Sequence, residues 1–263
     1  MARNPHRHMQ WFQQAPCPAL RPFVRRFMVV EFAADHADTH LPDTGSVAAF
    51  TFRGRCRIDG GRWVPQAAFT GLRDTLRAHD HHAGHSVLLA AFTPVGAAAF
   101  LRPSQEAFRG ATTDLSELLD RADELERLHE RLASASDHRQ RVAQLEHFLL
   151  ARLRESAPDP LMAAAVSWLE RRPAGHRIDA LTRHIGLSQS ALERRFRRVV
   201  GVTPKKFASM LRLQHAVRLQ ATGLDLTEVA LAAGYYDQAH FNHDFRRATG
   251  SAPAAFFAAR EPA

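Results

Sequence analysis

The C-terminal part of the chain contains the same pattern twice, and this repeat is the feature that most restricts the fold. The matched positions are Ile178, Leu181, Gly186, Phe196, Arg197, Arg198, Gly201, Pro204 and Phe207 in the first copy, and Leu226, Val229, Gly234, Phe245, Arg246, Arg247, Gly250, Pro253 and Phe256 in the second. The offset is 234 − 186 = 48 residues at the first glycine and 245 − 196 = 49 at the phenylalanine, so the second copy carries one inserted residue. Agreement at so many spaced positions is improbable by chance. The sequence therefore predicts two copies of one structural unit.

Each copy is predicted to form two helices joined by a tight turn. A glycine, Gly186 or Gly234, follows the first helix, and glycine readily adopts the left-handed conformation that ends a helix. The second helix then starts at an N-cap side chain, which accepts a hydrogen bond from a free backbone N–H. The N-caps are Ser188 and Asp237, and the inward apolar pairs four residues apart are Leu192 with Phe196 and Phe241 with Phe245. This arrangement is a helix-turn-helix, whose second helix enters the DNA major groove.

The outward residues of the two second helices are the candidate DNA-binding residues. Arginine reads guanine with two hydrogen bonds, asparagine and glutamine read adenine, and arginine also clamps phosphates. The candidates are Ser190, Glu193, Arg194, Arg197 and Arg198 in the first copy, and Gln238, Ala239, His240, Asn242, His243, Arg246 and Arg247 in the second. Residues 204–222 are predicted to form one linking helix of roughly 25 Å, at 1.5 Å per residue. Such a helix could hold both units on one side of a duplex, where successive major grooves lie about 34 Å apart.

Residues 161–257 resemble the DNA-binding domain of the AraC family of bacterial transcription regulators. The resemblance is carried by residues 185–196 (IGLSQSALERRF), 234–247 (GYYDQAHFNHDFRR) and 250–253 (GSAP). It implies a sequence-specific transcription regulator with two helix-turn-helix units, which contacts double-stranded DNA and RNA polymerase. It also implies that Ser190, Glu193, Arg194, Gln238, Ala239, His240, Asn242 and His243 face the bases. His243 departs from the arginine usual in the family, and activation is expected with repression as the alternative.

The distribution of charge agrees with a polyanionic partner for the same region. The whole chain has 35 Lys+Arg and 27 Asp+Glu, a net charge of +8. From Asp159 onward there are 15 basic and 9 acidic residues, a net charge of 15 − 9 = +6, which leaves +2 for the preceding residues. A basic C-terminal module suggests a polyanionic partner, and a bias toward solubility is the open alternative.

The N-terminal half has the pattern of a small β-rich domain. Residues 27–32, 46–52 and 86–92 are apolar runs of strand length with Pro, Gly or Asp at their boundaries, and residues 55–64 predict a hairpin. The expected architecture is a small barrel or sandwich. It more faintly resembles the sensor domains attached to some AraC-family members, which implies an unidentified small-molecule effector.

Between the two halves, residues 114–157 are predicted to form an amphipathic helical hairpin. Its first helix is expected to run from Leu115 to Leu132, and Asp137 can cap its second helix. Two alternatives are open: the hairpin covers the β-rich domain, or it forms the seam of a homodimer. The expected fold class is α+β, with a β-rich domain over 1–113, the hairpin over 114–157 and the DNA-binding domain over 158–263. Two prolines, Pro158 and Pro160, separate the last two segments.

The segment His79–His85 holds four histidines and one aspartate, and it suggests an alternative function. Such a cluster can bind a divalent transition metal, so the rival hypothesis is a metal-dependent β-barrel enzyme or a metal sensor. The interpretation preferred here is a polar loop between strands, with no metal, no cofactor and no enzymatic activity. Cys17 and Cys56 are expected to be structural or inert, since two cysteines provide no disulfide framework. Trp63, Phe69, Phe92 and Phe100 are expected to pack in the core rather than to line an effector pocket.

Hydropathy predicts neither a membrane partner nor a signal peptide. The chain has no apolar run near the roughly 18 residues that span a bilayer. The first residues, MARNPHRHMQW, carry charges without the apolar segment that follows them in a signal peptide. A cytoplasmic location is therefore expected.

Overall fold

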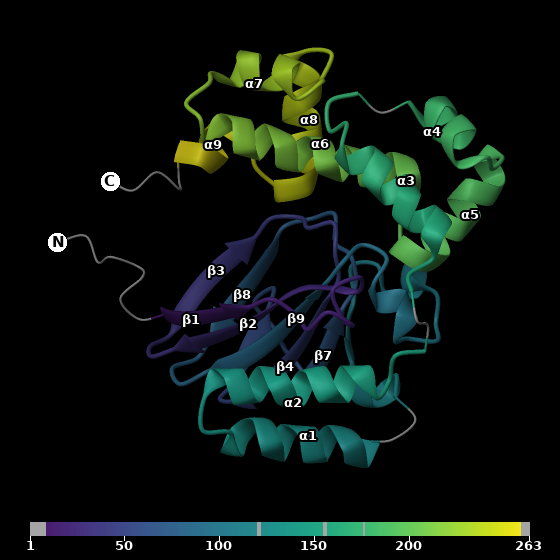
Figure 1. Ribbon diagram of the computed structural model, residues 1–263. Helices are drawn as coiled ribbons and strands as arrows, with labels where there is room; N and C mark the ends of the chain where they lie inside the picture. The colour runs from purple at the N-terminus through teal and green to yellow at the C-terminus, as the bar shows by residue number, and fades with distance from the viewer. Residues whose placement is uncertain (1–8, 120–121, 155–156, 176, 259–263) are drawn as a thin grey trace.

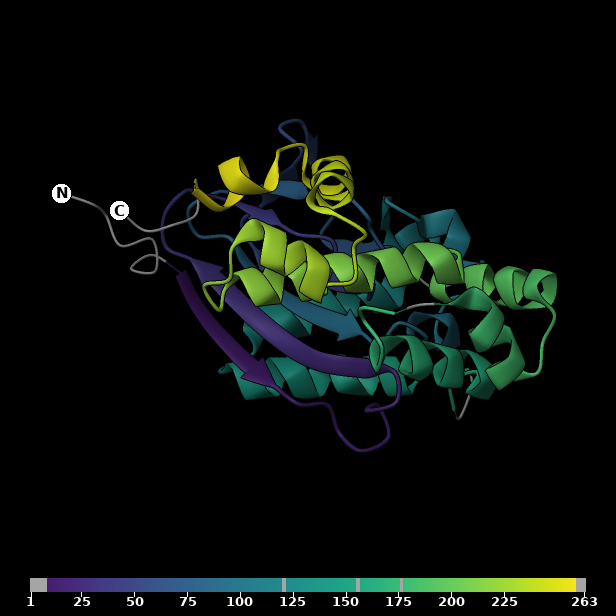
Figure 2. The same ribbon diagram turned by 90° about the horizontal axis from the view of Figure 1, so that it is seen from above.

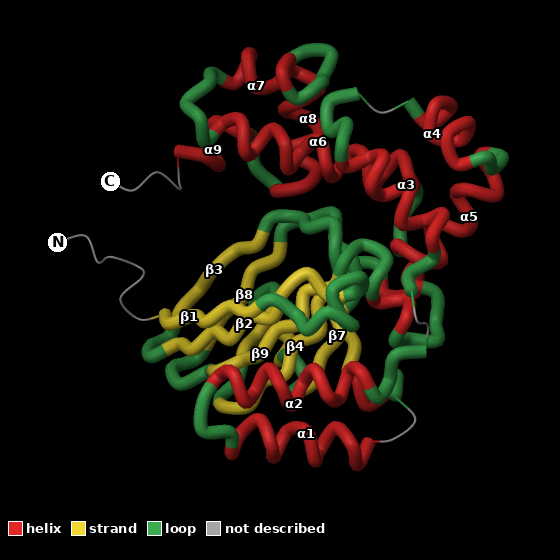
Figure 3. The backbone as a smooth tube through the Cα atoms, in the orientation of Figure 1, coloured by secondary structure: helices red, strands yellow, loops and turns green. Residues whose placement is uncertain are grey.

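The computed structural model describes residues 9–119, 122–154, 157–175 and 177–258 (Figure 1). The strands are β1 (Met9–Gln14), β2 (Val24–Phe32), β3 (His36–His40), β4 (Val47–Arg53), β5 (Cys56–Ile58), β6 (Arg62–Trp63), β7 (Ala67–Thr70), β8 (Arg77–His81), β9 (Ser86–Phe92) and β10 (Thr112–Asp114). The α-helices are α1 (Ala122–Ser134), α2 (His138–Leu150), α3 (Pro160–Glu170), α4 (Ile178–Ile185), α5 (Gln189–Val200), α6 (Pro204–Gln220), α7 (Leu226–Ala232), α8 (Gln238–Thr249) and α9 (Pro253–Ala258). Strands precede the main group of helices, which confirms the predicted α+β class (Figure 3).

The strands form two antiparallel sheets. The larger has the order β1-β2-β9-β4-β7-β10, and the smaller has the order β3-β8-β5-β6. Strand β9 pairs with β2 on one side and β4 on the other, and six of its seven residues are buried. Among the residues that the structure describes, no ladder joins the two sheets into a closed ring. The N-terminal part is therefore a pair of sheets rather than a barrel.

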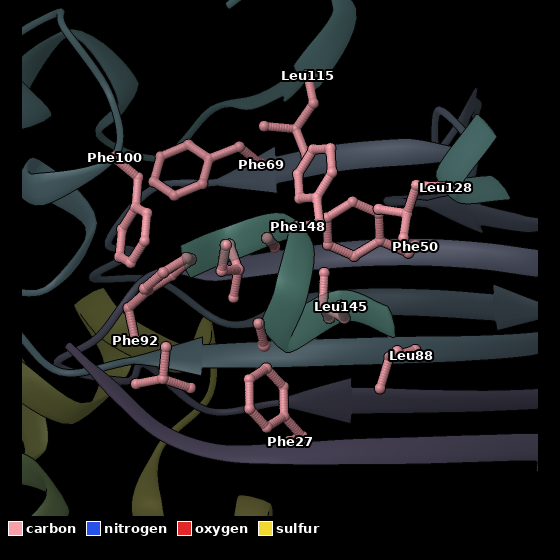
Figure 4. Close-up of a cluster of buried hydrophobic side chains, with 14 of the residues drawn as sticks. Phe27, Phe50, Phe69, Leu88, Phe92, Phe100, Leu115, Leu128, Leu145 and Phe148 are labelled. Carbon is pink, nitrogen blue, oxygen red and sulfur yellow. The ribbon is translucent and has the colours of Figure 1, made fainter. Parts of the chain in front are cut away.

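The hairpin of α1 and α2 packs against the larger sheet, and together they enclose one apolar core (Figure 4). Phe27 and Leu88 contribute from the strands, while Leu128, Leu145 and Phe148 contribute from the helices. Four of these five side chains are fully buried, and Phe148 is 4% exposed. Burial of this kind stabilises a fold by about 1.5–3 kcal/mol for each large apolar side chain. The apolar face of the hairpin thus covers the sheet, the first of the two functions predicted for it.

The start of the hairpin differs from the predicted continuous helix. Leu115–Glu117 is a separate 3-10 helix, capped where the Ser116 backbone N–H donates to Asp114 Oδ1 at 2.8 Å. Helix α1 begins only at Ala122. The cap satisfies a backbone N–H that is free at the start of this 3-10 helix. Leu115 is buried in the core beneath the larger sheet, so its position is set by packing on the sheet and not by continuation of α1. The second helix starts as predicted, with the Gln140 N–H donating to Asp137 Oδ1 at 2.8 Å.

Helix α6 is the axis of the helical part, with α4–α5 near one end and α7–α8 near the other (Figures 1 and 2). Two apolar cores meet on it. Phe207 and Met210 belong to the core of the first unit, and Leu213 and Ala216 to the core of the second. The predicted linking helix is therefore shared by both units rather than being a spacer between them.

The β-rich part contacts both helix-turn-helix units. Leu72 and Val95 are buried in the core of the first unit. Leu41 and Leu76 pack against the core of the second, and the Leu76 backbone N–H donates to the Ala248 carbonyl at 2.7 Å. Both halves of the chain are thus joined through apolar contacts and hydrogen bonds. None of the described helices is both long enough and apolar enough to span a bilayer.

Candidate nucleic-acid interface

The first unit has the local geometry that the repeat predicts. Helix α4 ends at Gly186, whose φ of 73° is the left-handed conformation. Ser188 then caps α5, with its hydroxyl oxygen accepting from the Ala191 N–H at 3.4 Å. Leu192 and Phe196 are fully buried, so the opposite side of α5 is turned outward.

The second unit repeats these features. Gly234 follows α7 with a φ of 82°, and Asp237 caps α8 by accepting from the His240 N–H at 2.7 Å. Phe241 and Phe245 are fully buried. A capping box adds to this unit, because Asp225 and Glu228 satisfy each other's backbone N–H groups at the start of α7. The two second helices thus begin in the same way and bury equivalent positions.

On α5, the candidate residues divide into free and paired side chains. Ser190, Arg194 and Arg198 are exposed. Glu193 and Arg197 are half-buried and pair with each other at 3.3 Å, and Arg197 also lies 3.8 Å from Glu106 of the β-rich part. The charge of Arg197 is therefore compensated in this conformation. Arg194 has no ion pair among the described residues, which leaves its guanidinium available for a base or phosphate.

On α8, most candidates are exposed and two are partly covered. The exposed ones are Ala239, His240, His243, Arg246 and Arg247. Gln238 is half-buried, and its Oε1 accepts from the Thr227 hydroxyl at 3.1 Å. Asn242 is also half-buried, and its Oδ1 is buried without a hydrogen-bond partner among the described residues. Asn242 is thus less exposed than predicted, because α8 turns its carbonyl oxygen inward.

A basic groove between α6 and α8 adds residues that the sequence did not single out. Its lining residues are Thr203, Lys205, Lys206, Ser209, Arg212, His240, Asp244 and Arg247. Lys205 is exposed, whereas Lys206 lies 2.6 Å from Asp74 of the β-rich part. Sequence reasoning missed the three basic α6 residues, Lys205, Lys206 and Arg212, because it assigned that helix only to linking. Their signal is present, since Lys205 and Lys206 follow the N-cap Thr203 and so lie in the first turn of a helix.

Comparisons with known proteins agree with this geometry. A family model described as a helix-turn-helix domain matches residues 181–259. The transcriptional regulator MtrA of Neisseria gonorrhoeae is 37% identical over 71 residues, which are 27% of this chain and 24% of MtrA. The transcriptional activator RhaR of Salmonella schwarzengrund (strain CVM19633) is 32% identical over 106 residues, 40% of this chain and 36% of RhaR. The solved DNA-binding domain of AdpA, a global transcriptional factor in complex with a target DNA, is 33% identical, covers 38% of this chain and 92% of that chain, and has a TM-score of 0.36.

The C-terminal part of the chain is an AraC-type helix-turn-helix domain. The resemblance carried by residues 185–196, 234–247 and 250–253 is thereby confirmed. The chain spans between 24% and 36% of the length of the curated relatives it matches. The matched residues start at Leu181, in α4, and extend past α9. The AraC-type domain therefore contains both repeats and the linking helix α6.

The histidine cluster lies elsewhere, and only part of it is the polar loop that the sequence predicted: His82 and His85 lie in the turn between β8 and β9. His79 and His81 are in strand β8, where the antiparallel ladder brings Asp38 of β3 opposite His79. Burial lowers the pKa of His79 and of His85 to about 4, so both rings are neutral at pH 7. Burial would raise the pKa of Asp38, but the neighbouring His40 and His81 hold it well below its usual range. The structure thus joins part of the predicted cluster to two β3 residues that the sequence analysis did not select.

Phe69, Phe92, Phe100 and Cys56 take the positions expected of core residues, whereas Trp63 and Cys17 are only half-buried. Phe69, Phe92 and Phe100 are buried around a cavity of about 30 Å³, which is the volume of about one water in the liquid. Trp63 is half-buried and outside that cavity. Cys56 is buried, and burial raises the pKa of its thiol to about 12, so the nucleophilic thiolate is disfavoured. The cavity lined by Phe69, Phe92 and Phe100 is too small for an organic effector.

Proposed function

We propose that this protein is a sequence-specific transcription regulator that binds double-stranded DNA through α5 and α8. The observation that carries the proposal is the repeated unit: in both copies the N-cap of a helix lies two or three residues after a left-handed glycine, and that helix turns basic side chains outward. An AraC-type domain that spans both copies supports the same function. Because its target would be bacterial DNA, the protein would act in the cytoplasm. It would regulate by binding, so the proposal includes no enzymatic reaction.

In this proposal the exposed arginines have two kinds of target. Arg194 faces outward one helical turn into α5, where a side chain in the major groove reaches base edges. Arg198, Arg246 and Lys205 are exposed at the flanks and would bind phosphates. His243 would take a base-facing position on α8. The division of the chain into residues 1–113, 114–157 and 158–263 belongs to the same proposal, with the first segment controlling the last.

The partners other than DNA follow from this division. The β-rich part would carry the effector site, and RNA polymerase would be the partner in activation of transcription; the relative RhaR is named a transcriptional activator. A homodimer would form through the free edge strand β1, where Trp11 is 67% exposed. Size-exclusion chromatography of the full chain with and without Trp11→Ser tests that last contact.

The test of DNA recognition is selection of bound sequences from random duplexes by the full chain, followed by titration of the selected duplex. Arg194→Ala should weaken binding of the selected sequence by roughly 1–3 kcal/mol, about fivefold to 150-fold, because a guanidinium that reads a base edge is lost. Arg139→Ala is the matched control: it removes the same charge from an exposed position on α2, at the far side of the sheet. The affinity of the Arg139→Ala protein for the selected duplex should stay near that of the unchanged protein.

Two outcomes would contradict the proposal. One is the absence of any enriched sequence after selection at physiological salt. The other is an equal loss of affinity for selected and unrelated duplexes in the Arg194→Ala protein, which would show that the residue supplies charge without reading sequence.

A further inference from the structure

Strands β3 and β8 place several metal-binding side chains on one face of the smaller sheet. In their antiparallel register Asp38 is opposite His79, and His36 is opposite His81. Side chains two positions apart in a strand point to the same face, so His40 shares the face of Asp38. Neither strand brings these groups together by itself, since residues 38 and 79 are far apart in the sequence.

The distances between these side chains are those of a ligand set. Asp38 Oδ1 lies 3.1 Å from His40 Nε2 and 3.7 Å from His79 Nδ1, and Asp38 Oδ2 lies 3.6 Å from His81 Nε2. One potential ligand atom from each of Asp38, His40 and His79 lies within 4.8 Å of the others. Two atoms bound tetrahedrally to zinc at about 2.0–2.1 Å are about 3.3 Å apart. These three side chains therefore need only small adjustments to surround one ion, and His81, which is not one of the three, reaches the set through Asp38 Oδ2.

A second observation points to a ligand at the same place. His79 Nδ1 and His81 Nε2 are buried and have no hydrogen-bond partner among the described residues, and Asp38 Oδ1, also buried, is in ion-pair contact with His40 Nε2 at 3.1 Å. Buried polar atoms are nearly always hydrogen-bonded, because an unpaired one costs about 1–3 kcal/mol. Here two such atoms lie beside the Asp38 carboxylate, and a cation between them would satisfy both.

The side chains behind the cluster fix the orientation that a ligand requires. His81 Nδ1 lies 2.9 Å from His85 Nδ1, and His85 Nε2 lies 3.3 Å from the Thr51 hydroxyl oxygen. If this chain of hydrogen bonds runs from His81 to His85 to Thr51, the Nδ1 of His81 is protonated and its Nε2 keeps the lone pair. Metal-binding histidines typically donate their second ring N–H to such a partner. The Phe32 ring stacks on His81 at 3.9 Å and limits its rotation.

We propose that Asp38, His40 and His79, with His81 as the fourth ligand, form a binding site for a divalent transition metal ion such as Zn²⁺. Three imidazoles and one carboxylate suit zinc and its neighbours in the first transition row, and they do not suit Mg²⁺ or Ca²⁺. His40 is 62% exposed while the other ligands are largely buried, so the ion enters from the His40 side. The site is structural or regulatory and requires no enzymatic step.

The position of the site assigns it an effect on the second helix-turn-helix unit, an extension that rests on the proposed function. His40 is followed directly by Leu41, and β8 is preceded directly by Leu76; both leucines pack against the core of that unit. The Leu76 N–H also binds the Ala248 carbonyl of α8. An ion that draws β3 and β8 together therefore acts on strands that hold α8, and it should change the affinity for DNA.

The test of the site is titration of the metal-free full chain with Zn²⁺ by calorimetry, and with Co²⁺ by visible absorption. We expect one ion per chain and the intense absorption of four-coordinate cobalt. His40→Ala and His79→Ala should each weaken binding at least tenfold, and His40 is exposed enough for its variant to fold. His147→Ala, an exposed histidine of α2, is the control and should bind as before. No binding near one equivalent, or equal binding by the His40→Ala chain, would overturn the site.

The extension to DNA has a separate readout. With the selected duplex, Zn²⁺ should change the affinity of the unchanged protein at least threefold and leave the His40→Ala protein unaffected. If zinc binds as proposed but the DNA affinity does not change, the regulatory extension is wrong and the metal site stands. If neither form binds any duplex, the proposed function fails, and the zinc and cobalt titrations still decide the site.

Discussion

Tyr235 has a buried phenol oxygen without a hydrogen-bond partner among the described residues. Burial, together with the charge of Asp244, raises the pKa of this phenol well above its usual range near 10. Because the folded protein favours the neutral phenol, the free energy of unfolding does not depend on this titration below about pH 10, the pKa in the unfolded chain. As pH rises from there through the folded-state pKa, the free energy of unfolding falls. At neutral pH, by contrast, the unpaired oxygen itself contributes nothing favourable.

We therefore expect Tyr235→Phe to leave the free energy of unfolding at pH 7 unchanged or to raise it by up to about 1 kcal/mol, since it removes a buried polar atom without a partner. Above pH 10 the variant should lose less stability than the unchanged protein. Urea unfolding at several pH values measures both effects, and Tyr236→Phe, at an 88% exposed position, is the control. A loss above about 1 kcal/mol at pH 7 would show that the oxygen has a partner.

At the scale of elements, the two turns of the repeat differ in their surroundings. Gly186 and Gly234 both have left-handed φ values, 73° and 82°. A Cβ on Gly186 would meet no atom within 4 Å, whereas a Cβ on Gly234 would lie 2.0 Å from the Ala174 carbonyl oxygen. The second glycine therefore also allows the turn between α7 and α8 to contact the segment between α3 and α4.

Alanine at the two positions separates these effects. Gly186→Ala should lower the free energy of unfolding by about 1–2 kcal/mol, which is the cost of a left-handed alanine. Gly234→Ala should cost a further 1–3 kcal/mol or so, because the Ala174 backbone has to move. Thermal or urea unfolding of both proteins measures the difference. Equal losses at the two sites would mean that the contact between Gly234 and Ala174 is not part of the folded protein.

The elements that the sequence predicted best depend on local chemistry. Ser188, Asp237 and the helix-ending glycines act within a few residues, so the repeat and its helices are visible in the sequence. The start of α1 was missed because Leu115 is placed by packing on the sheet, a long-range contact that helical periodicity does not detect. Asp38 was missed because its neighbour His79 comes from cross-strand register. The alternation of His36, Asp38 and His40 was the available signal for a shared face.

At the scale of the whole molecule, the β-rich part contacts both helix-turn-helix units through polar and apolar groups. Gln214 Nε2 donates to the Pro42 carbonyl at 3.1 Å, and Arg197 lies 3.8 Å from Glu106. Lys206 Nζ lies 2.6 Å from Asp74 Oδ2. Burial would raise the pKa of Asp74, but hydrogen bonds and charges from Lys206 and Arg109 lower it, so the carboxylate is ionised at neutral pH. Under the proposed function, the ion pairs of Arg197 and Lys206 occupy basic groups that DNA phosphates would otherwise bind.

Asp74→Asn should therefore raise the affinity for DNA. The substitution keeps the size of the side chain and removes the charge that holds Lys206, so Lys206 becomes free to bind a phosphate beside the groove of α6 and α8. An ion pair worth about 1 kcal/mol corresponds to a rise of about fivefold, and the titration should be repeated at higher salt, where the rise shrinks. Arg109→Ala is the control, because it removes the other partner of Asp74 and leaves the Lys206 pair intact. If Asp74→Asn binds DNA no better than Arg109→Ala does, Lys206 is not held back by the β-rich part, and control of DNA binding must act through the contacts of Leu41 and Leu76 instead.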